Sequence, residues 1–437
     1  MTRLVRPAAI AILAALSVLG GAPPAHARDA EKTRVLVVGI DAGEWDVLGP
    51  LMDRGQCPNF TRLRATGSAG RLRSLLPLTR SPVIWASIAT GKVPEKHGIQ
   101  DFFAPEIGGE LLREEAQGVG QRPVTSNLWN ARPVWNILGA LNRTVGVIGW
   151  WATWPAQPVN GVLVSDYVQY ETKWADGSTS LTYPDSLEAM VQRLRRTAQS
   201  VSWSEILQFV APFDTTQVTA RQKKILRALR TTYAGDMTFY RAGLALYKEE
   251  RPDFFAVYFR GVDEVSHHYW DLDGPGRFDP PLTKAEIAWL EPLIPNYYIF
   301  TDRLLGEFLR VAGKDTDVIV CSDHGFGGGG TGVMAHKPDG IIFMTGPHMV
   351  KGGTITGATV LDITPTILAT FGLPTARDMD GRPIQGGLLP RIVKRIERDT
   401  RLPTYETARA KGESKEPLRS PVDDELRERL RSLGYIQ

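Results

Sequence analysis

The sequence of 437 residues is poor in cysteine, with Cys57 and Cys321 as its only two. So few thiols exclude a disulfide-stapled scaffold and a cysteine-rich zinc site. The two cysteines could pair in an oxidising compartment or lie apart as buried thiols. A large excess of one charge sign is also missing, because 51 Lys and Arg residues stand against 48 Asp and Glu residues. We therefore expect no binding to duplex nucleic acid through its phosphates.

A hydrophobic run long enough to span a membrane is missing too. The apolar run from Ala8 to Leu19 falls short of the ~20 residues that a spanning helix needs, and glycine and proline follow it. Arg3 and Arg6 precede this run and Ala25-His26-Ala27 ends the segment, which is the pattern of a cleaved secretory signal. We expect residues 1–27 to be a signal peptide and the remaining chain to be exported, either periplasmic or secreted, without a membrane span.

Short β-branched and aromatic runs recur along the chain, and each ends in a polar residue or glycine. Such continuous apolar runs are typical of strands buried on both faces of a parallel sheet. Helical patterns lie between them, so the sequence predicts an α/β fold with a doubly wound, mostly parallel sheet and helices on both faces. The expected strands are Val35–Ile40, Thr144–Ile148, Val162–Ser165, Phe254–Phe259 and Asp317–Cys321. The expected helices are Gly43–Arg54, Asn59–Thr66, Val134–Leu141, Leu187–Gln199, Gln222–Glu250 and Glu286–Val311.

Two regions interrupt this alternation. Residues 169–235 are rich in Thr, Ser, Trp and charged residues, and we expect them to form a cap or insertion. The catalytic core would then comprise residues 28–168 and 236–385. Residues 386–437 are rich in Arg and Glu with weak periodicity, which favours a helical tail on the surface.

Carboxylates and imidazoles gather at the ends of the predicted strands, where ligands bind in such sheets. Asp263 and His267 are four residues apart, so a helix would point both the same way, as a metal chelate requires. Only 7 histidines occur in the chain, and three of them, His267, His324 and His336, are candidate ligands in these segments. The candidate metal ligands are Asp41, Asp263, His267, Asp323, His324 and His336.

This donor set suits Zn²⁺ better than Mn²⁺, because it combines hard carboxylates with imidazoles. Three carboxylates and three imidazoles suffice for two ions. Two ions ~4 Å apart could hold the attacking and leaving oxygens of an in-line displacement.

A further segment, Thr79-Arg80-Ser81-Pro82, begins a predicted helix. A serine at this position is most often a helix cap. It is also the place where free backbone N–H groups and the helix dipole attract a phosphoryl or sulfuryl oxygen.

Together these motifs resemble the alkaline phosphatase superfamily, in its type I phosphodiesterase/nucleotide pyrophosphatase branch. The motifs that carry the resemblance are Asp41, Ser87-Ile88-Ala89-Thr90-Gly91, Pro94-Glu95-Lys96-His97-Gly98-Ile99, Asp263-x-x-x-His267, Ser322-Asp323-His324-Gly325 and His336. The resemblance implies one zinc on Asp41, Ser81, Asp323 and His324, and another on Asp263, His267 and His336. Counting back from Gly91, the nucleophile falls on Ser81, with Thr79 as the second choice.

The sequence departs from this family at Ile84, where the resemblance implies a phosphate-binding asparagine. Arg80 or Lys337 could supply the missing stabilisation of charge. Trp150 and Trp151 follow a predicted strand and could wall a substrate pocket, or they could equally be packing residues. His97 has no role in the implied chemistry, and we expect it to be structural.

The resemblance implies a dizinc phosphodiesterase or nucleotide pyrophosphatase that acts through a phosphoseryl intermediate on a small phosphoester, such as a nucleotide or a lipid headgroup. A phosphomonoesterase or a transferase moving a phospho-group onto a glycan or lipid headgroup is the alternative enzyme. A silent, metal-stabilised binding protein is the alternative of another class.

Overall fold

The computed structural model describes residues 33–77, 79–104, 122–171, 180–213, 218–274, 276–327, 335–398, 401–407 and 416–436. The expected signal peptide, residues 1–27, lies outside them. Within the described ranges, no helix combines the length and apolar character that a bilayer crossing requires.

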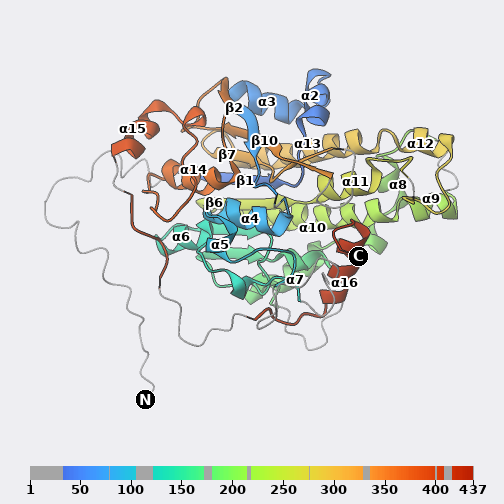
Figure 1. The fold of residues 1–437 in the computed structure, drawn as a ribbon, viewed down its shortest axis with the longest axis horizontal. Helices are drawn as coiled ribbons and strands as arrows, with labels where there is room; N and C mark the ends of the chain where they lie inside the picture. The colour runs from blue at the N-terminus through green and yellow to red at the C-terminus, as the bar shows by residue number, and fades with distance from the viewer. Residues whose placement is uncertain are drawn as a thin grey trace, which may run out of the picture.

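A nine-stranded sheet in the order β11-β2-β10-β7-β1-β6-β3-β4-β5 forms the centre of the described structure (Figure 1). Strands β7, β1, β6, β3 and β4 are parallel neighbours, whereas β10 runs antiparallel between β7 and β2, and β5 antiparallel to β4. The mostly parallel sheet that the sequence predicts is thus confirmed. The strands are β1 (Val35–Ile40), β2 (Ser68–Arg73), β3 (Val145–Ile148), β4 (Gly161–Val164), β5 (Thr182–Tyr183), β6 (Phe254–Phe259), β7 (Asp317–Cys321), β10 (Asp339–Thr345) and β11 (Gly353–Ile355). A separate pair is β8 (Gly325–Phe326) with β9 (His336–Lys337).

Helices cover both faces of the sheet, and the alternating side chains of β6 show which helix lies on which face. Tyr258 packs against Trp85 of α4, with ring centroids 4.9 Å apart. Its neighbour Phe259 points the other way, onto Phe308 of α13, at 6.1 Å. The helices are α2 (Trp45–Asp53), α3 (Pro58–Thr66), α4 (Ser81–Thr90), α5 (Pro94–His97), α6 (Val134–Ala140), α7 (Glu188–Leu194), α8 (Trp203–Leu207), α9 (Ala220–Ile225), α10 (Arg227–Glu250), α11 (Gly261–Tyr269), α12 (Lys284–Leu290), α13 (Leu293–Ala312), α14 (Ile363–Thr370), α15 (Pro390–Arg398) and α16 (Asp423–Ser432).

Three of the predicted helices differ from the structure in their extent. The pattern over Gln222–Glu250 covers two helices, α9 and α10, which meet at Leu226. The pattern over Glu286–Val311 also divides, into α12 and α13, with Pro292 at the start of the second. Proline is tolerated at a helix start but breaks a helix interior, so the division follows from its fixed geometry. The helix expected over Leu187–Gln199 ends early, at Leu194.

The two irregular regions contain short elements. The described part of residues 169–235 contributes β5 to the edge of the main sheet, followed by α7, α8 and α9. The tail forms α15 and α16, and α16 turns its buried Leu426 and Leu430 inward. Cys57 and Cys321 are separate, buried free thiols, so the alternative of a disulfide is wrong.

Candidate active site

Strands β1 and β7 deliver the first group of polar side chains to the carboxyl edge of the sheet. Asp41 directly follows β1, and Asp323 and His324 follow β7. The Nε2 atom of His324 lies 3.4 Å from Oδ1 of Asp41 and 3.3 Å from Oδ2 of Asp323. The turn after β1 holds Ala42 at φ 55°, and its N–H donates to Oδ1 of Asp323 at 3.2 Å. This left-handed residue costs about 1–2 kcal/mol, and its N–H links the two strand ends.

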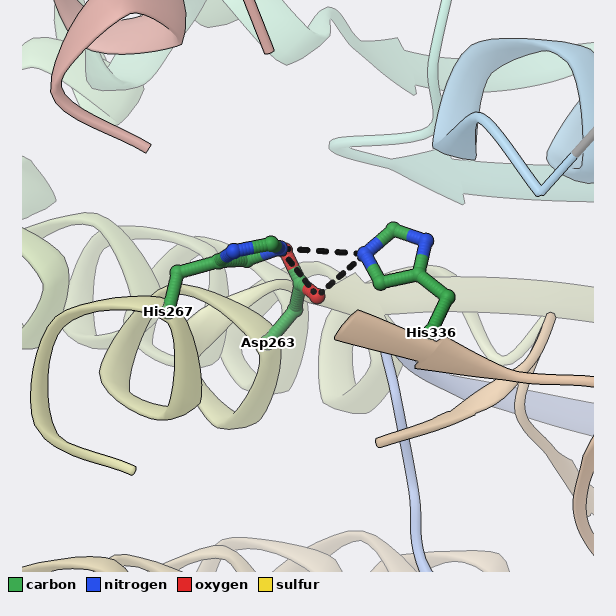
Figure 2. A group of neighbouring side chains, drawn as sticks. All are labelled: Asp263, His267 and His336. Carbon is green, nitrogen blue, oxygen red and sulfur yellow. Dashed lines mark hydrogen bonds and ion pairs between the residues drawn. The ribbon is translucent and has the colours of Figure 1, made fainter. Parts of the chain in front are cut away.

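A second group is formed by α11 and β9 (Figure 2). Asp263 and His267 lie one turn apart on α11, and His336 points toward them from β9. Oδ1 of Asp263 is 3.3 Å from Nε2 of His267 and 3.5 Å from Nε2 of His336. The two imidazole Nε2 atoms are 3.0 Å apart. The three side chains therefore converge on one point, as the spacing on the predicted helix indicates.

Backbone carbonyls orient two of the imidazoles. Nδ1–H of His336 donates to the carbonyl of Thr79 at 2.7 Å, and Nδ1–H of His324 donates to the carbonyl of Gly325 at 3.0 Å. Each Nε2 atom consequently carries a lone pair that faces the carboxylates. This arrangement is the usual way in which proteins fix a histidine for metal binding.

The residues present fit a metal centre, because four of their facing atoms have no hydrogen-bond partner. Buried polar atoms without a hydrogen bond are rare and need an explanation. Four of those found among the described residues belong to this site: Oδ1 of Asp41, Oδ1 of Asp263, Oδ2 of Asp323 and Nε2 of His324. Asp263 also lies within reach of both groups, since ligand atoms of Asp41, Asp263 and His324 are all within 4.8 Å of one another. A divalent cation would satisfy these atoms.

The pKa values of the three carboxylates show how strongly burial and mutual repulsion act on them. Burial, together with the nearby charge of Asp263, raises the pKa of Asp41 to about 7. Burial and the charge of Asp41 raise the pKa of Asp323 well above its usual range. Burial also acts to raise the pKa of Asp263, but His267 and His336 outweigh it and hold that pKa well below its usual range. Without a cation, this crowding of carboxylates disfavours their ionised forms.

Ser81 is the first residue of α4. Its side chain is buried and lines a cavity together with Asp41 and Asp263. Helix α4 comes close to β1 because Gly39 has no side chain, and a Cβ atom there would lie 2.7 Å from the ring of Trp85. Thr79, the second-choice nucleophile, contacts the site through its backbone carbonyl, which holds His336.

The cavity above Ser81 is narrow, with a volume of about 20 Å³. Trp151 lines it and donates its Nε1–H to the hydroxyl of Tyr258 at 2.8 Å. Arg260 lies over the ring of Trp151, 4.9 Å from its centroid, and its Nε atom has no hydrogen-bond partner. The cavity thus combines an aromatic wall with two arginines, Arg429 and the buried Arg260.

The structure does not bring all the predicted binding residues to this cavity. Arg80 pairs with Asp101 at 2.6 Å, and Lys337 pairs with Asp46 at 2.7 Å. Trp150 packs in the core and donates its Nε1–H to the carbonyl of Trp85. At the position where the family pattern has an asparagine, Ile84 is fully buried.

His97 has the structural role that we expect. It is fully buried, its Nδ1 atom accepts from the N–H of Ile99 at 3.2 Å, and its Nε2–H donates to the hydroxyl of Ser87 at 2.9 Å. Burial lowers its pKa to about 3, so the ring is neutral. His97 therefore ties the end of α5 to the middle of α4.

Sequence reasoning misses four residues of the site. Tyr258 donates its hydroxyl hydrogen to Oδ2 of Asp41, and Arg260 stands between β6 and α11. Asp236 accepts from the backbone N–H groups of Arg260 and Gly261, at 3.1 and 3.2 Å. Tyr435 reaches the second group from the C-terminal tail. Arg260 could have been found, because it directly follows a buried strand, as Asp41 does.

The fold and the site define the class of this protein as a mixed α/β chain with carboxylates, imidazoles and a serine hydroxyl gathered at the carboxyl edge of its sheet. The sequence pattern of the type I phosphodiesterase/nucleotide pyrophosphatase family matches residues 35–346. The chain belongs to this family, and hence to a family of phosphoester hydrolases. Among curated proteins, no sequence matches significantly.

Solved structures with similar folds are distant in sequence. Phosphonoacetate hydrolase from Sinorhizobium meliloti 1021 is 17% identical with a TM-score of 0.40, over 68% of this chain and 57% of its own. The chain thus spans little more than half the length of that hydrolase. Human ectonucleotide pyrophosphatase/phosphodiesterase 5 is 13% identical with a TM-score of 0.43, over 80% of this chain and 97% of its own. A 2-O GAG sulfatase is 10% identical with a TM-score of 0.48, over 80% of this chain and 73% of its own.

Proposed function

We propose that this chain is an exported phosphodiesterase that holds two Zn²⁺ ions and uses Ser81 as its nucleophile. One observation carries this proposal: buried atoms of Asp41, Asp263, Asp323 and His324 face one another without partners beside Ser81. The matched family supports hydrolysis of a phosphoester. When bound, the two ions supply Lewis acidity that favours an alkoxide over a hydroxyl and stabilises negative charge on oxygen.

Asp41, Ser81, Asp323 and His324 would hold one ion, and Asp263, His267 and His336 the other. Ser81 attacks phosphorus with its Oγ atom, and the ester oxygen on the opposite side leaves. The resulting phosphoseryl bond is then hydrolysed by water, which returns Ser81 to its starting state. This two-step displacement needs no histidine base, because a bound cation would favour the alkoxide form of Ser81. The Nδ1–H groups of His324 and His336 donate to backbone carbonyls, and their Nε2 lone pairs would serve as metal ligands.

We assign to Arg260 the contact with a phosphoryl oxygen that Ile84 cannot make. An aliphatic side chain offers no hydrogen bond to a phosphoryl oxygen, whereas the guanidinium of Arg260 lines the same cavity as Ser81. Guanidinium groups bind phosphoryl oxygens with paired, charge-assisted hydrogen bonds. Trp151 would pack against the remainder of the substrate, such as a nucleotide base or a lipid headgroup.

Metal analysis combined with a panel of phosphoesters tests this function on protein that lacks residues 1–27. We expect two Zn²⁺ ions per chain and faster hydrolysis of a nitrophenyl diester or nucleotide diester than of a nitrophenyl monoester. Faster monoester hydrolysis would favour a phosphomonoesterase. Transfer to an added glycan or lipid headgroup acceptor would favour a transferase. Bound metal with no turnover of any ester would favour the alternative of a silent, metal-stabilised binding protein.

A further inference from the structure

The C-terminal tail places a phenol hydroxyl in the middle of the second ligand group. The hydroxyl oxygen of Tyr435 lies 2.9 Å from Nε2 of His267, 3.0 Å from Nε2 of His336 and 3.3 Å from Oδ2 of Asp263. These contacts join residues that are up to 172 positions apart in the chain. Because the family match ends at residue 346, Tyr435 lies outside the shared sequence pattern.

Hydrogen bonding alone does not account for this cluster. Nε2 of His336 carries a lone pair, because its Nδ1–H donates to Thr79, and both oxygens of the Asp263 carboxylate also carry lone pairs. The phenol of Tyr435 has a single proton to donate. Several acceptors therefore converge on too few protons, which is the situation that a cation resolves.

The spacing of the four groups is close to that of a metal site. Zinc bonds to nitrogen and oxygen of about 2.0–2.2 Å place tetrahedral ligand atoms roughly 3.3–3.5 Å apart. Oδ1 of Asp263 lies 3.3 and 3.5 Å from the two imidazole Nε2 atoms and its Oδ2 lies 3.3 Å from the Tyr435 hydroxyl, whereas the two Nε2 atoms and this hydroxyl are slightly closer to one another, at 2.9–3.0 Å. Catalytic zinc sites typically have three protein ligands and one open position. Tyr435 stands where that fourth ligand would be.

Helix α16 fixes this placement. Arg429 forms an ion pair with Glu264, on the helix that carries Asp263 and His267, and donates to Oε1 of Gln169 at 3.2 Å. The ring of Tyr435 packs on Phe102, with centroids 4.7 Å apart. The tail also lines the cavity above Ser81 through Leu426, Leu430, Leu433 and Tyr435. The remaining volume of about 20 Å³ holds about one water molecule, so a phosphoester cannot enter while the tail stays in place.

We infer that Tyr435 is a ligand of the cation held by Asp263, His267 and His336, so that the C-terminal tail blocks its own active site until a substrate displaces it. This inference rests on the metal site of the proposed function. Metal binding requires deprotonated ligands and releases protons, so the phenol is bound as phenolate.

A near-ultraviolet difference spectrum during Zn²⁺ titration tests the ligand directly, because tyrosinate absorbs at longer wavelength and more strongly than neutral tyrosine. We expect a tyrosinate signal in the full chain that is lost in Tyr435→Phe, which keeps the ring contact with Phe102. Zn²⁺ affinity should fall about tenfold in this variant, or about 1.4 kcal/mol. Tyr405→Phe is the matched control, since its hydroxyl donates to the carbonyl of Pro374 away from the site.

A signal that persists in Tyr435→Phe but disappears in Tyr258→Phe would assign it to the phenol beside Asp41 and overturn the inference. An unchanged signal in all variants would overturn it as well. Circular dichroism and the thermal unfolding midpoint verify that each variant is folded.

Turnover at saturating Zn²⁺ provides the second readout. In Tyr435→Phe the substrate no longer has to displace a phenolate from the cation. We therefore expect kcat/KM for a nitrophenyl diester to rise about tenfold in this variant while its Zn²⁺ affinity falls. A merely structural role would lower both, and that result would contradict the inference. If no ester is hydrolysed but the spectral signal depends on Tyr435, the proposed function fails and the ligand assignment stands. If esters are hydrolysed but the spectra are identical, the ligand assignment fails and the function stands.

Discussion

Two parts of the molecule meet at the cavity above Ser81, and they arrive there in different ways. The carboxyl edge of the sheet delivers Asp41, Asp323 and His324 within a few residues of buried strands that pair along their whole length. The tail delivers Tyr435 through α16, which the ion pair between Arg429 and Glu264 helps to hold. The edge is therefore part of the sheet itself, whereas the tail attaches to it through side-chain contacts, including the buried Leu426 and Leu430.

This difference suggests two roles, a reaction centre at the edge of the sheet and a regulatory element in the tail. The edge residues cannot move without disrupting β1, β6 or β7, so they suit a preorganised reaction centre. The tail can detach while the sheet remains intact, because local opening costs less than global unfolding. We therefore expect changes at the edge to abolish activity and changes in the tail to adjust it.

Replacing the proposed nucleophile should give the largest effect. If Ser81 is the nucleophile, Ser81→Ala removes the attacking oxygen, and we expect hydrolysis of a nitrophenyl phosphate ester to fall by about 10³-fold or more. Thr79→Ala is the comparison variant and should keep most of the activity, because Thr79 holds His336 through its backbone carbonyl. Steady-state kinetics of both variants measure this. Activity retained in Ser81→Ala and lost in Thr79→Ala would transfer the nucleophile to Thr79.

Removing the metal should destabilise the edge of the sheet. A cation that binds only the folded chain adds about 4 kcal/mol to its stability when present at about a thousand times its dissociation constant. We expect a chelator to lower the thermal unfolding midpoint and added Zn²⁺ to restore it. Asp263→Asn should reduce this shift, because only the ion on Asp41, Ser81, Asp323 and His324 would remain, whereas Asp101→Asn, whose carboxylate pairs with Arg80, should retain it in full. Equal midpoints with chelator and with Zn²⁺ would argue against the metal centre.

The same contrast explains what could be predicted from the sequence. Asp41 and Asp323 each follow a continuous apolar run, so a local pattern identifies both the buried strand and the polar residue at its end. All five expected strands are present for this reason. Strand β10 is not among the expected strands, and its direction could not have been predicted either, because an apolar run has the same appearance in a parallel and an antiparallel strand.

Residues whose position depends on tertiary packing were not predictable. Trp150 and Trp151 are adjacent in sequence, yet only Trp151 lines the cavity, while Trp150 packs against Trp85 in the core. Tyr435 is 168 residues from His267, and no local pattern connects them. Arg80 and Lys337 have charges suited to phosphate, but each lies beside a carboxylate that the sequence does not place.

The pH dependence of stability tests the contacts by which Asp236 of α10 holds the start of α11. Burial raises the pKa of Asp236 to about 7, while this carboxyl accepts from the N–H groups of Arg260 and Gly261 and from Tyr297. The folded state therefore binds its proton more tightly than the unfolded state does. The stabilisation that the protonated Asp236 gives to the folded state is complete below pH ~4 and is lost as the pH rises through about 7. It amounts to about 1.4 kcal/mol for each unit by which the folded pKa exceeds the unfolded pKa.

Urea unfolding between pH 4 and pH 8 measures this effect. Asp236→Asn stays neutral, so its stability should depend less on pH than that of the unmodified chain. Asp166→Asn should produce a smaller change over a narrower range, because burial raises the pKa of Asp166 only to about 6. Parallel stability profiles for Asp236→Asn and the unmodified chain would show that Asp236 does not titrate in this range.

The smallest effect is expected from loosening the tail without touching Tyr435. Arg429→Gln removes the ion pair with Glu264, but Glu264 still accepts from Thr232 at 2.7 Å and faces Arg260 at 3.6 Å, so its carboxylate keeps partners. We expect a loss of about 1.5 kcal/mol, which makes opening of the tail about tenfold more frequent. Hydrogen exchange should accelerate by this factor at the amides of α16 and remain unchanged in β1.

Arg427→Gln, which alters an ion pair with the exposed Asp424 inside α16, should have a much weaker effect. Equal acceleration in α16 and β1 would mean that the tail unfolds only with the whole protein, and the distinction between a fixed edge and a movable tail would then be lost.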